Sequence, residues 1–339
     1  MTTMQWIEFP DVRFPVFGLP WFAENSPSVQ RFPARLKPLL RSEVWDLSLM
    51  PAGGRIRFAA DTTSLSLRVS YDDVTPGNNF SRIGQMGFDV YIDGQFYKPV
   101  WPEKTGQSEL TFFSELPRTR REYTLYMPNY KAVTIRAVAV DSDALLAPPA
   151  PYANDRPVVF YGTSITQGGC CSHSGMSYQG ILSRLLNIDY VNLGFSGEGR
   201  GEPECAAAVA EIDASCFVLD FAQNCPTVDE LVERYGPFID TIRAAHPDTP
   251  IVCITPIFAT RLLFEDAART RHDGLSQVIR KETARRIAAG DTRLVTVEGL
   301  TLLSPADSDC LVDGIHPNDL GFYREAHRLA PVIESALRL

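Results

Sequence analysis

The sequence predicts two units: a smaller antiparallel β-sandwich, followed by an α/β domain with a doubly wound parallel sheet flanked by helices. Three observations carry this prediction. The 339 residues exceed the usual size of a single hydrophobic core, residues from about 44 to 141 alternate with period two, and short apolar runs alternate with helical patterns beyond residue 157. A proline-rich stretch at 144–157 separates the two patterns, so we expect domains at 1–147 and 148–339.

The alternation in the first unit is typical of half-buried strands. The run SLSLRVSY at 64–71 has an apolar residue at every second position, and GFDVYIDGQFY at 87–97 repeats the pattern with Asp93-Gly94 as a hairpin turn. Residues 124–141 predict two more strands, separated by Pro128-Asn129. The first 43 residues show no clear period, and we expect loops and one short helix packed on the sandwich.

The second unit has five short apolar runs, and helical patterns lie between them. The predicted strands are 158–162, 190–194, 216–222, 251–257 and 293–299, and the predicted helices lie near 177–187, 203–212, 228–245, 271–289 and 319–337. Thr227 and Glu230 form a capping signal before the third of these helices. Because parallel sheets collect functional loops at the carboxyl ends of their strands, we expect the site there.

Charge and apolar content exclude several classes of partner. The net charge of −9 argues against a nucleic-acid partner, since nucleic-acid binding depends on clustered Lys and Arg. The N-terminus MTTMQWIEFPDVRFP lacks a basic segment followed by an apolar one, and no run of about 18 apolar residues occurs. We therefore expect a cytoplasmic protein without a membrane partner. The oligomeric state is not predicted.

The cysteines predict free thiols. Seven Cys, none in C-x-x-C spacing, form an odd set. Cys170 and Cys171 follow closely on Ser164, which leaves a redox or binding role open beside simple packing. No His/Cys/Asp cluster has metal-ligand spacing and no glycine-rich loop fits a nucleotide, so we expect neither metal nor cofactor.

Ser164 is the candidate nucleophile because it lies just past the first predicted strand of the second unit. In YGTSITQGG, Gly162 allows a close backbone approach and the Ser164 amide is free to face a substrate oxygen. Thr166 stands where the G-x-S-x-G elbow of α/β-hydrolases needs a second glycine. Taken alone, a serine here also fits a turn or a helix cap.

Partners for this serine follow the later strands. Asp313 and His316 in LVDGIHPND are three residues apart, so the carboxylate can hold one imidazole nitrogen while the other faces Ser164; a surface turn is the alternative. Gly197, in NLGFSGEGR, and Asn224, in LDFAQNCP, can offer N–H groups to a tetrahedral oxyanion. A turn glycine and a capping asparagine are the alternatives for these two.

Four blocks of the second unit resemble a known superfamily. GTSIT, GFSGEGR, AQNCP and DGIHPND are similar to blocks I, II, III and V of the SGNH/GDSL hydrolases, and the resemblance spans about 157–339. It implies a flavodoxin-like sheet. The chain departs from the pattern where it reads G-T-S-I instead of G-D-S-L and Q-N-C instead of G-x-N-D, which puts the pocket wall in doubt.

The resemblance also implies a role for each residue of the blocks. Ser164 would be the nucleophile, His316 the general base and acid, and Asp313 its orienting partner. The amides of Ser164 and Gly197 and the side chain of Asn224 would form the oxyanion hole. The segment containing GFDVYIDG resembles the jelly-roll-like β-sandwich of a two-domain branch that includes presumed carbohydrate esterases and an aryl-acyl transferase of polyketide tailoring.

These observations predict a serine esterase that removes a short, acetyl-like acyl group from a carbohydrate or other polyhydroxylated substrate through an acyl-serine intermediate. The alternatives are an acyltransferase acting on a natural-product alcohol and a non-catalytic glycan-binding protein. His173 is a candidate substrate contact, with packing as its alternative. Arg200 is a candidate contact for an anionic substrate group, with a surface ion pair as its alternative. Asp220 is expected to accept hydrogen bonds from neighbouring loop amides, and His272 to be a surface or packing residue.

Overall fold

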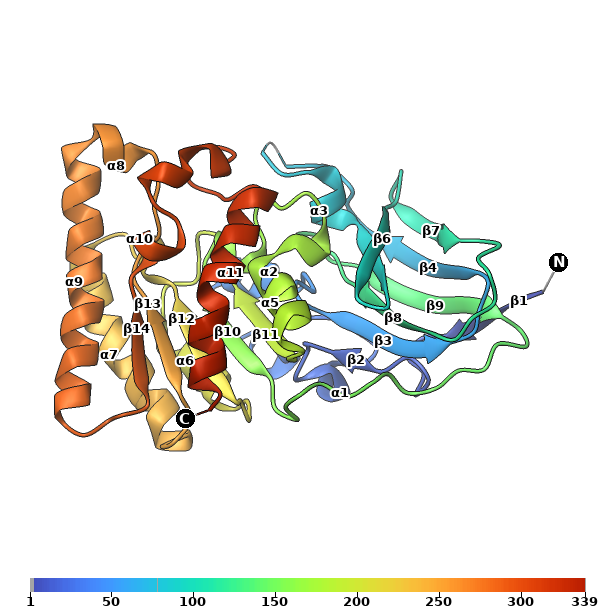
Figure 1. The fold of residues 1–339 in the computed structure, drawn as a ribbon, viewed down its shortest axis with the longest axis horizontal. Coiled ribbons are helices and arrows are strands. Elements are labelled where there is room, and N and C mark those ends of the chain that lie inside the picture. Colours follow the sequence, from blue (N-terminus) through green and yellow to red (C-terminus); the bar gives the residue numbers. More distant parts are fainter. Residues whose placement is uncertain (1–2, 78, 339) are drawn as a thin grey trace.

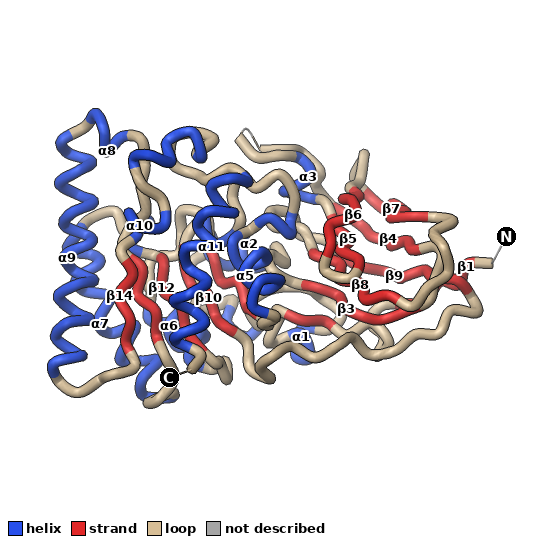
Figure 2. The backbone as a smooth tube through the Cα atoms, in the orientation of Figure 1, coloured by secondary structure: helices blue, strands red, loops and turns tan. Residues whose placement is uncertain are grey.

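A computed structural model of the chain describes residues 3–77 and 79–338, so the outer limits of the predicted domains, residues 1 and 339, lie outside the described residues. A sandwich of antiparallel strands and a helix-flanked parallel sheet lie side by side along the long axis (Figure 1). Helices gather around the parallel sheet, whereas strands and loops make up most of the sandwich (Figure 2). The predicted fold class is confirmed.

The sandwich contains two antiparallel sheets. The first has the order β1 (Met4–Glu8), β9 (Thr134–Asp141), β4 (Leu65–Tyr71), β7 (Gly106–Phe113). The second has the order β2 (Val16–Phe17), β3 (Arg55–Ala60), β8 (Arg121–Tyr126), β5 (Phe88–Ile92), β6 (Gln95–Val100). Alternate residues of these strands fill the core between the sheets, as the period of two requires. Asp93 and Gly94 both have positive φ, as a tight hairpin turn needs, and they join β5 to β6.

The parallel sheet has the order β11, β10, β12, β13, β14, which is the 2-1-3-4-5 order of flavodoxin-like folds. Its strands are β10 (Val158–Gly162), β11 (Tyr190–Gly194), β12 (Cys216–Asp220), β13 (Ile251–Ile254) and β14 (Leu294–Val297). β10 and β11 have the predicted bounds. β12 and β13 are shorter than predicted, because the apolar runs continue past the paired residues into loops.

Helices cover both faces of this sheet. α5 (Tyr178–Leu186) and α11 (Asp319–Ala336) pack together on one face, and α6 (Pro203–Ala210), α7 (Val228–Ala245) and α9 (Asp266–Ala288) cover the other. The shorter helices are α1 (Phe22–Asn25), α2 (Ser42–Ser48), α3 (Arg82–Met86), α4 (Ser164–Gln167), α8 (Arg261–Phe264) and α10 (Gly299–Leu302), with 3₁₀ turns η1 (Ala34–Leu36), η2 (Ser174–Met176), η3 (Ala222–Asn224) and η4 (Pro305–Cys310). In the part of the chain that the structure describes, no helix combines the length and apolar character needed to cross a membrane.

The N-terminal segment differs from its prediction. β1 and β2 are strands where loops were expected. Phe9, Phe14 and Val29 pack in the sandwich core as expected, but Trp21 and Phe32 pack in the core of the parallel sheet. Arg31 explains part of this packing. Its buried guanidinium donates to the carbonyls of Met50 (2.8 Å), Asn192 (3.3 Å) and Gly194, and lies over the ring of Phe195.

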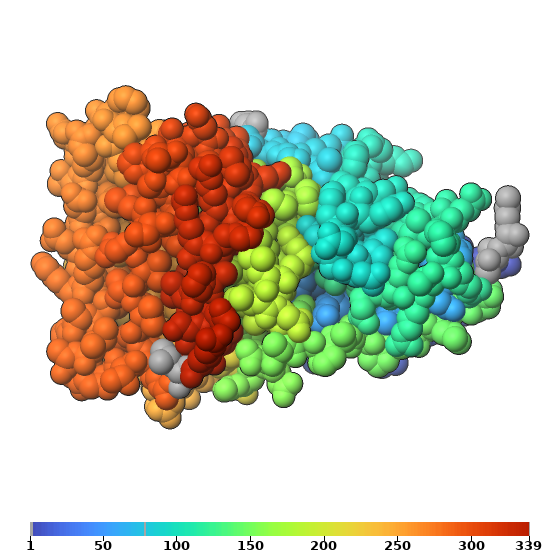
Figure 3. Space-filling view, in the orientation of Figure 1, coloured from blue at the N-terminus to red at the C-terminus, as the bar shows by residue number. Residues whose placement is uncertain are grey.

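The two units therefore share buried contacts. No gap separates them in the space-filling view (Figure 3), where the light-blue stretch around residues 70–90 lies beside yellow-green and red segments. The boundary at 147/148 stays a prediction. Within the parallel sheet, β10 lies between β11 and β12, so the strand order switches from one side of β10 to the other. The loops after these strands open a crevice at their carboxyl ends.

Candidate active site

A tight turn at the end of β10 places Ser164 in this crevice. A Cβ on Gly162 would lie 2.1 Å from the Thr166 hydroxyl, so only glycine fits there. The Thr163 side chain accepts the Ile165 amide at 3.2 Å, and the Thr166 hydroxyl accepts the Thr163 amide at 3.2 Å. This reciprocal cap fixes Ser164 as the first residue of α4.

Three predicted residues meet in one chain of hydrogen bonds. The Ser164 hydroxyl lies 2.8 Å from His316 Nε2, and His316 Nδ1 lies 2.8 Å from Asp313 Oδ2. Asp313 Oδ1 also accepts the amides of Ile315 (3.1 Å) and His316 (2.9 Å). Partial burial opposes ionisation of Asp313, but these hydrogen bonds outweigh it and lower the pKa of the carboxyl to about 2. Asp313 is therefore a fixed anion beside the imidazole.

Residues of the first unit contact the same three residues, and the sequence analysis did not identify them. Asn79, in the loop between β4 and α3, donates from Nδ2 to Asp313 Oδ2 at 2.6 Å. The Phe80 ring meets His316 edge-on with 6.1 Å between ring centroids, and it stacks on Tyr130. The Tyr130 hydroxyl donates to the Ser164 carbonyl at 3.0 Å. These residues lie in loops without periodic pattern, so no local signal marks them.

Gly197 and Asn224, the two residues predicted to offer N–H groups to an oxyanion, lie in the cavity beside Ser164. Gly197 has a φ of +73°, which L side chains rarely adopt, and a Cβ there would meet no atom within 4 Å. Asn224, at the end of η3, donates one amide hydrogen to the Phe195 carbonyl at 3.1 Å. Its second hydrogen remains available to a ligand. Ser164, Gly197 and Asn224 all line the same cavity.

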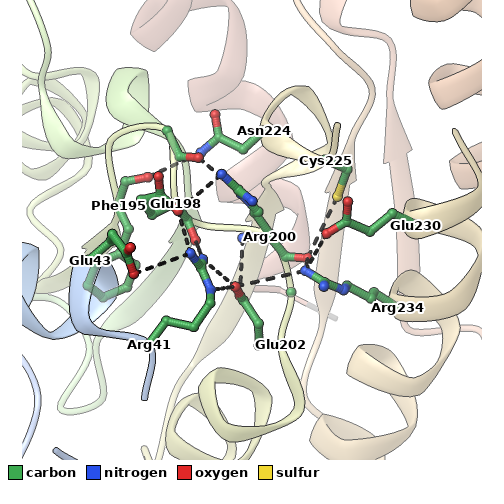
Figure 4. Close-up of polar contacts among 12 residues, drawn as sticks. Arg41, Glu43, Phe195, Glu198, Arg200, Glu202, Asn224, Cys225, Glu230 and Arg234 are labelled. Atoms are coloured by element: carbon green, nitrogen blue, oxygen red, sulfur yellow. Dashed lines mark hydrogen bonds and ion pairs between the residues drawn. The ribbon is translucent and has the colours of Figure 1, made fainter. Parts of the chain in front are cut away.

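An ion-pair network supports the loop that carries Gly197 (Figure 4). Arg41, from the first unit, donates to the Glu198 carbonyl (2.9 Å) and to the carboxylates of Glu198 (2.5 Å) and Glu202. Arg200 pairs with Glu198 at 3.1 Å and donates to the Gly197 carbonyl at 3.2 Å. The structure thus places Arg200 in a loop-supporting ion pair, outside the cavity lining.

His173, the other candidate substrate contact, also lies outside the cavity lining. Its Nδ1 is 2.6 Å from Asp89 Oδ2, and its ring stacks on Phe96 with 4.1 Å between centroids. Both partners belong to β5 and β6 of the sandwich. The structure therefore gives His173 a packing position between the two units.

The cavity beside Ser164 has a volume of about 520 Å³. Its described lining begins at residue 163, so no sandwich residue forms its wall. The lining consists of Thr163, Ser164, Ile165, Ser196, Gly197, Gln223, Asn224, Pro256, Ile257, Ala259, Arg261, Leu262, Ala267, Ala268, Arg271, His272, Leu275, Ile315 and His316. His272 lies in this wall, with Nε2 2.9 Å from the Pro256 carbonyl. A single sequence gives no sign that the first turns of α9 form a pocket wall.

Buried carboxyl groups lie beneath α4. Asp220 accepts the Thr166 hydroxyl at 3.3 Å instead of the expected loop amides, so that expectation is wrong. Burial raises the pKa of Asp220 to about 7. Glu325, on α11, has no hydrogen-bond partner among the described residues for either carboxylate oxygen, and burial, followed by the neighbouring Asp220, raises its pKa well above the ordinary value.

The seven cysteines are free and buried, as predicted. Burial and then Asp313 raise the pKa of Cys170 to about 12, so its thiol is a poor nucleophile at neutral pH. Cys170, Asp313 and His316 have potential metal-ligand atoms within 4.8 Å of one another. Because both imidazole nitrogens already hydrogen-bond to Ser164 and Asp313, we assign these residues to the hydrogen-bonded chain and not to a metal.

Comparison with known proteins gives consistent matches to both units. Residues 155–334 match the GDSL-like Lipase/Acylhydrolase family, and residues 4–146 match the N-terminus of Esterase_SGNH_hydro-type. No match is found among curated protein sequences.

Solved structures resemble the chain over most or nearly all of its length. A putative GDSL-like lipase from Bacteroides ovatus has a TM-score of 0.89 and 28% identity, covering 99% of this chain and 98% of that one. Salicylyl-acyltransferase SsfX3 from a tetracycline biosynthetic pathway has a TM-score of 0.85 and 17% identity over 98% and 97%. A family two carbohydrate esterase from Clostridium thermocellum has a TM-score of 0.62 and 18% identity over 85% and 93%.

Proposed function

The chain belongs to the GDSL-like Lipase/Acylhydrolase family and is an SGNH/GDSL esterase or acyltransferase, and from this premise we propose that it works through an acyl-Ser164 intermediate. One observation carries the proposal: the Ser164 hydroxyl, the His316 imidazole and the Asp313 carboxylate form one chain with 2.8 Å at each link. A nucleophile, a base and a group that orients the base are what acyl transfer to serine requires.

Each residue then has a definite step. His316 Nε2 takes the proton of Ser164 as Oγ attacks the ester carbonyl carbon, and Asp313 stabilises the imidazolium. The carbonyl oxygen becomes an oxyanion that accepts from the amides of Ser164 and Gly197 and from Asn224 Nδ2. The C–O bond to the alcohol then breaks, and His316 returns the proton to the leaving oxygen. Water, activated by the same imidazole, releases the acid and restores Ser164.

Ester hydrolysis is our first candidate, with the alcohol portion leaving past His316 toward solvent. A carbohydrate or other polyhydroxylated alcohol fits this position because the solvent side can accept polar groups. The family two carbohydrate esterases among the structural neighbours support this choice by likeness of fold. The size of the cavity favours acyl groups larger than the acetyl group that the sequence suggested, since about 520 Å³ lies within the usual range of small-molecule pockets.

Transfer to an acceptor alcohol is the second candidate, because an apolar cavity can hold an alkyl or aryl acyl group while water is partly excluded. The salicylyl-acyltransferase among the neighbours has a similar fold over nearly the whole chain. Hydrolysis and transfer share the acyl-enzyme and differ in the acceptor. Adding alcohols to the assay separates them: an acceptor that accelerates product release and yields a new ester favours transfer.

The test of the common intermediate is the Ser164→Ala variant with p-nitrophenyl butyrate. We expect kcat to fall at least about 10³-fold, while the circular dichroism spectrum and Tm stay close to those of the wild type. Ser142→Ala, at an exposed sandwich serine, is the matched control and should keep full activity. Wild-type rates in Ser164→Ala would refute the proposal.

A further inference from the structure

The cavity beside Ser164 has basic but no acidic side chains in its described lining, although the chain as a whole is acidic. Two guanidinium groups, Arg261 and Arg271, line it, and none of its described lining residues is Asp or Glu. The net charge of the chain is −9. A pocket whose charge opposes that of its protein favours a ligand of the opposite sign.

Arg271 is the distinctive group in this wall. Its Nη2 donates to the carbonyls of Gln223 (3.0 Å) and Cys225 (2.6 Å), and its Nε donates to the Pro226 carbonyl at 3.4 Å. No carboxylate of the described residues pairs with it, and its Nη1 has no hydrogen-bond acceptor among them. Burial, followed by the nearby Arg261, lowers the pKa of Arg271, as expected for a guanidinium group that has no carboxylate partner.

Arg261 provides the contrast. It lies in the same wall, but its Nη2 is 3.0 Å from a Glu265 carboxylate oxygen, so its charge is already balanced. A half-buried cation that lacks such a partner is unfavourable unless a ligand supplies the negative group. Beyond the Ser164 end, this cavity therefore offers two open donors: Arg271 Nη1, and Gln223 Nε2, which is buried and has no partner among the described residues.

The surface between Ser164 and Arg271 is apolar. Ile257 and Leu262 come from the loop and short helix after β13, and Ala268 and Leu275 lie on the same face of α9 as Arg271. A ligand that fills this space needs an apolar body, with a reactive carbonyl at one end and an acceptor for a guanidinium at the other.

Resting on the proposed function, we propose that this cavity is an acyl subsite for acids that carry a second, terminal carboxylate on an apolar spacer, and that Arg271 binds that carboxylate. We place the acyl half of the ester in the cavity because Arg271 hydrogen-bonds to the carbonyls of Gln223 and Cys225, on either side of Asn224. An acyl group that extends past the proposed oxyanion site therefore reaches Arg271. The chemistry at Ser164 is unchanged: the monoester of a dicarboxylic acid loses its alcohol, and water releases the diacid.

The test compares p-nitrophenyl hexanoate with mono-p-nitrophenyl adipate, which share the leaving group and differ in the terminal carboxylate. We expect the wild type to give at least a tenfold higher kcat/KM for the adipate monoester. A series with acetate and butyrate checks that kcat/KM rises with acyl length, as occupation of the cavity by the acyl group requires. A ratio of adipate to hexanoate at or below one would overturn the proposal.

Variants at Arg271 separate ligand binding from loop support. Arg271→Lys and Arg271→Gln both lose the contacts to the loop carbonyls, so both should slow hexanoate hydrolysis to a similar degree. Only Arg271→Gln loses the charge, so its adipate preference should fall to near one, whereas Arg271→Lys keeps several-fold preference. Arg285→Gln, exposed on the same helix and outside the cavity lining, is the matched control and should change the ratio less than twofold. An equal ratio in the wild type and Arg271→Gln would contradict the assignment.

Failure of this inference can be distinguished from failure of the proposed function. If hexanoate is hydrolysed through Ser164 but the adipate preference is missing, the acyl subsite is wrong and the proposed function stands. If neither ester acylates Ser164, both fall together.

Discussion

The two sides of the Ser164–His316–Asp313 chain are built from different units and make different kinds of contact. On one side, Asn79 and Tyr130 of the first unit hydrogen-bond to Asp313 and Ser164. On the other, the cavity wall comes only from residues 163–316 among the described residues. We therefore propose that the first unit sets the geometry of the reacting groups and that the second unit selects the acyl group. Substitutions in the first unit should slow all esters alike, whereas substitutions in the wall should change the ratio between esters.

The largest expected effect concerns Asp220, a buried carboxyl group of the second unit that accepts a hydrogen bond from Thr166 in α4, the helix that begins at Ser164. Burial raises the pKa of Asp220 from 3.8 to about 7, so between these values the folded chain retains a proton that the unfolded chain has lost. The free energy of unfolding should thus fall as pH rises from about 4 to 7, by up to about 4 kcal/mol from this group. Asp220→Asn should flatten this fall, as measured by urea unfolding.

The control is the exposed Asp309→Asn, which should leave the pH dependence as in the wild type. The opposite result is a free energy of unfolding that rises between pH 4 and 7 and loses this rise in Asp220→Asn. It would show that folding stabilises the carboxylate form of Asp220. The contrast between a buried neutral acid beneath Ser164 and the neutral donors of the first unit would then not hold.

The second prediction concerns the wall. Ala268→Phe fills part of the cavity from α9, so kcat/KM for p-nitrophenyl hexanoate should fall about 100-fold because overpacking costs roughly 1–3 kcal/mol, while acetate changes little. Ala284→Phe, exposed on the same helix, is the control. Equal losses for acetate and hexanoate would contradict the role of the wall in selection.

The third prediction concerns the first unit. Asn79→Ala removes a hydrogen bond to a carboxylate, which should lower kcat about 10- to 100-fold by the same factor for acetate, butyrate and hexanoate, with KM nearly constant. Thr75→Ala, exposed in the same loop, serves as control. A loss confined to one acyl length would assign Asn79 to substrate contact instead.

The smallest expected effect concerns the network of Figure 4. Arg41→Met leaves Glu198 and Glu202 without their cation from the first unit, so the loop carrying Gly197 should loosen. Because partly exposed ion pairs contribute about 1 kcal/mol, we expect kcat to fall about fivefold for all esters. Measurement of kcat in Arg41→Lys should show partial recovery, and an unchanged kcat in Arg41→Met would remove this residue from the positioning set.

Local patterns in the sequence predict the parallel sheet well because each strand is a short apolar run between helices. β10 and β11 begin and end at the predicted residues. The apolar runs that contain β12 and β13 extend beyond the ends of these strands. Residues such as Ile257, at the end of the second run, line the cavity instead of pairing with a neighbouring strand. Periodicity cannot separate an apolar residue in a strand from one in a pocket wall.

Contacts between distant segments were not predictable in the same way. Arg31 binds carbonyls about 160 residues away, and Asn79 binds Asp313 across 234 residues, so neither leaves a periodic signal. Conversely, Ser164, His316, Gly197 and Asn224 could be proposed because each follows a strand of one sheet, whose carboxyl ends must lie together. His173 and Arg200 follow the same strands, but their nearest charged partners, Asp89 and Glu198, draw them out of the cavity lining.

The most direct test of acylation at Ser164 is intact-mass and peptide analysis after reaction with a fluorophosphonate. We predict one adduct, located on Ser164, in the folded wild type, no adduct in Ser164→Ala, and strongly slowed labelling in His316→Ala. An adduct on another residue, or wild-type labelling of Ser164→Ala, would contradict the account.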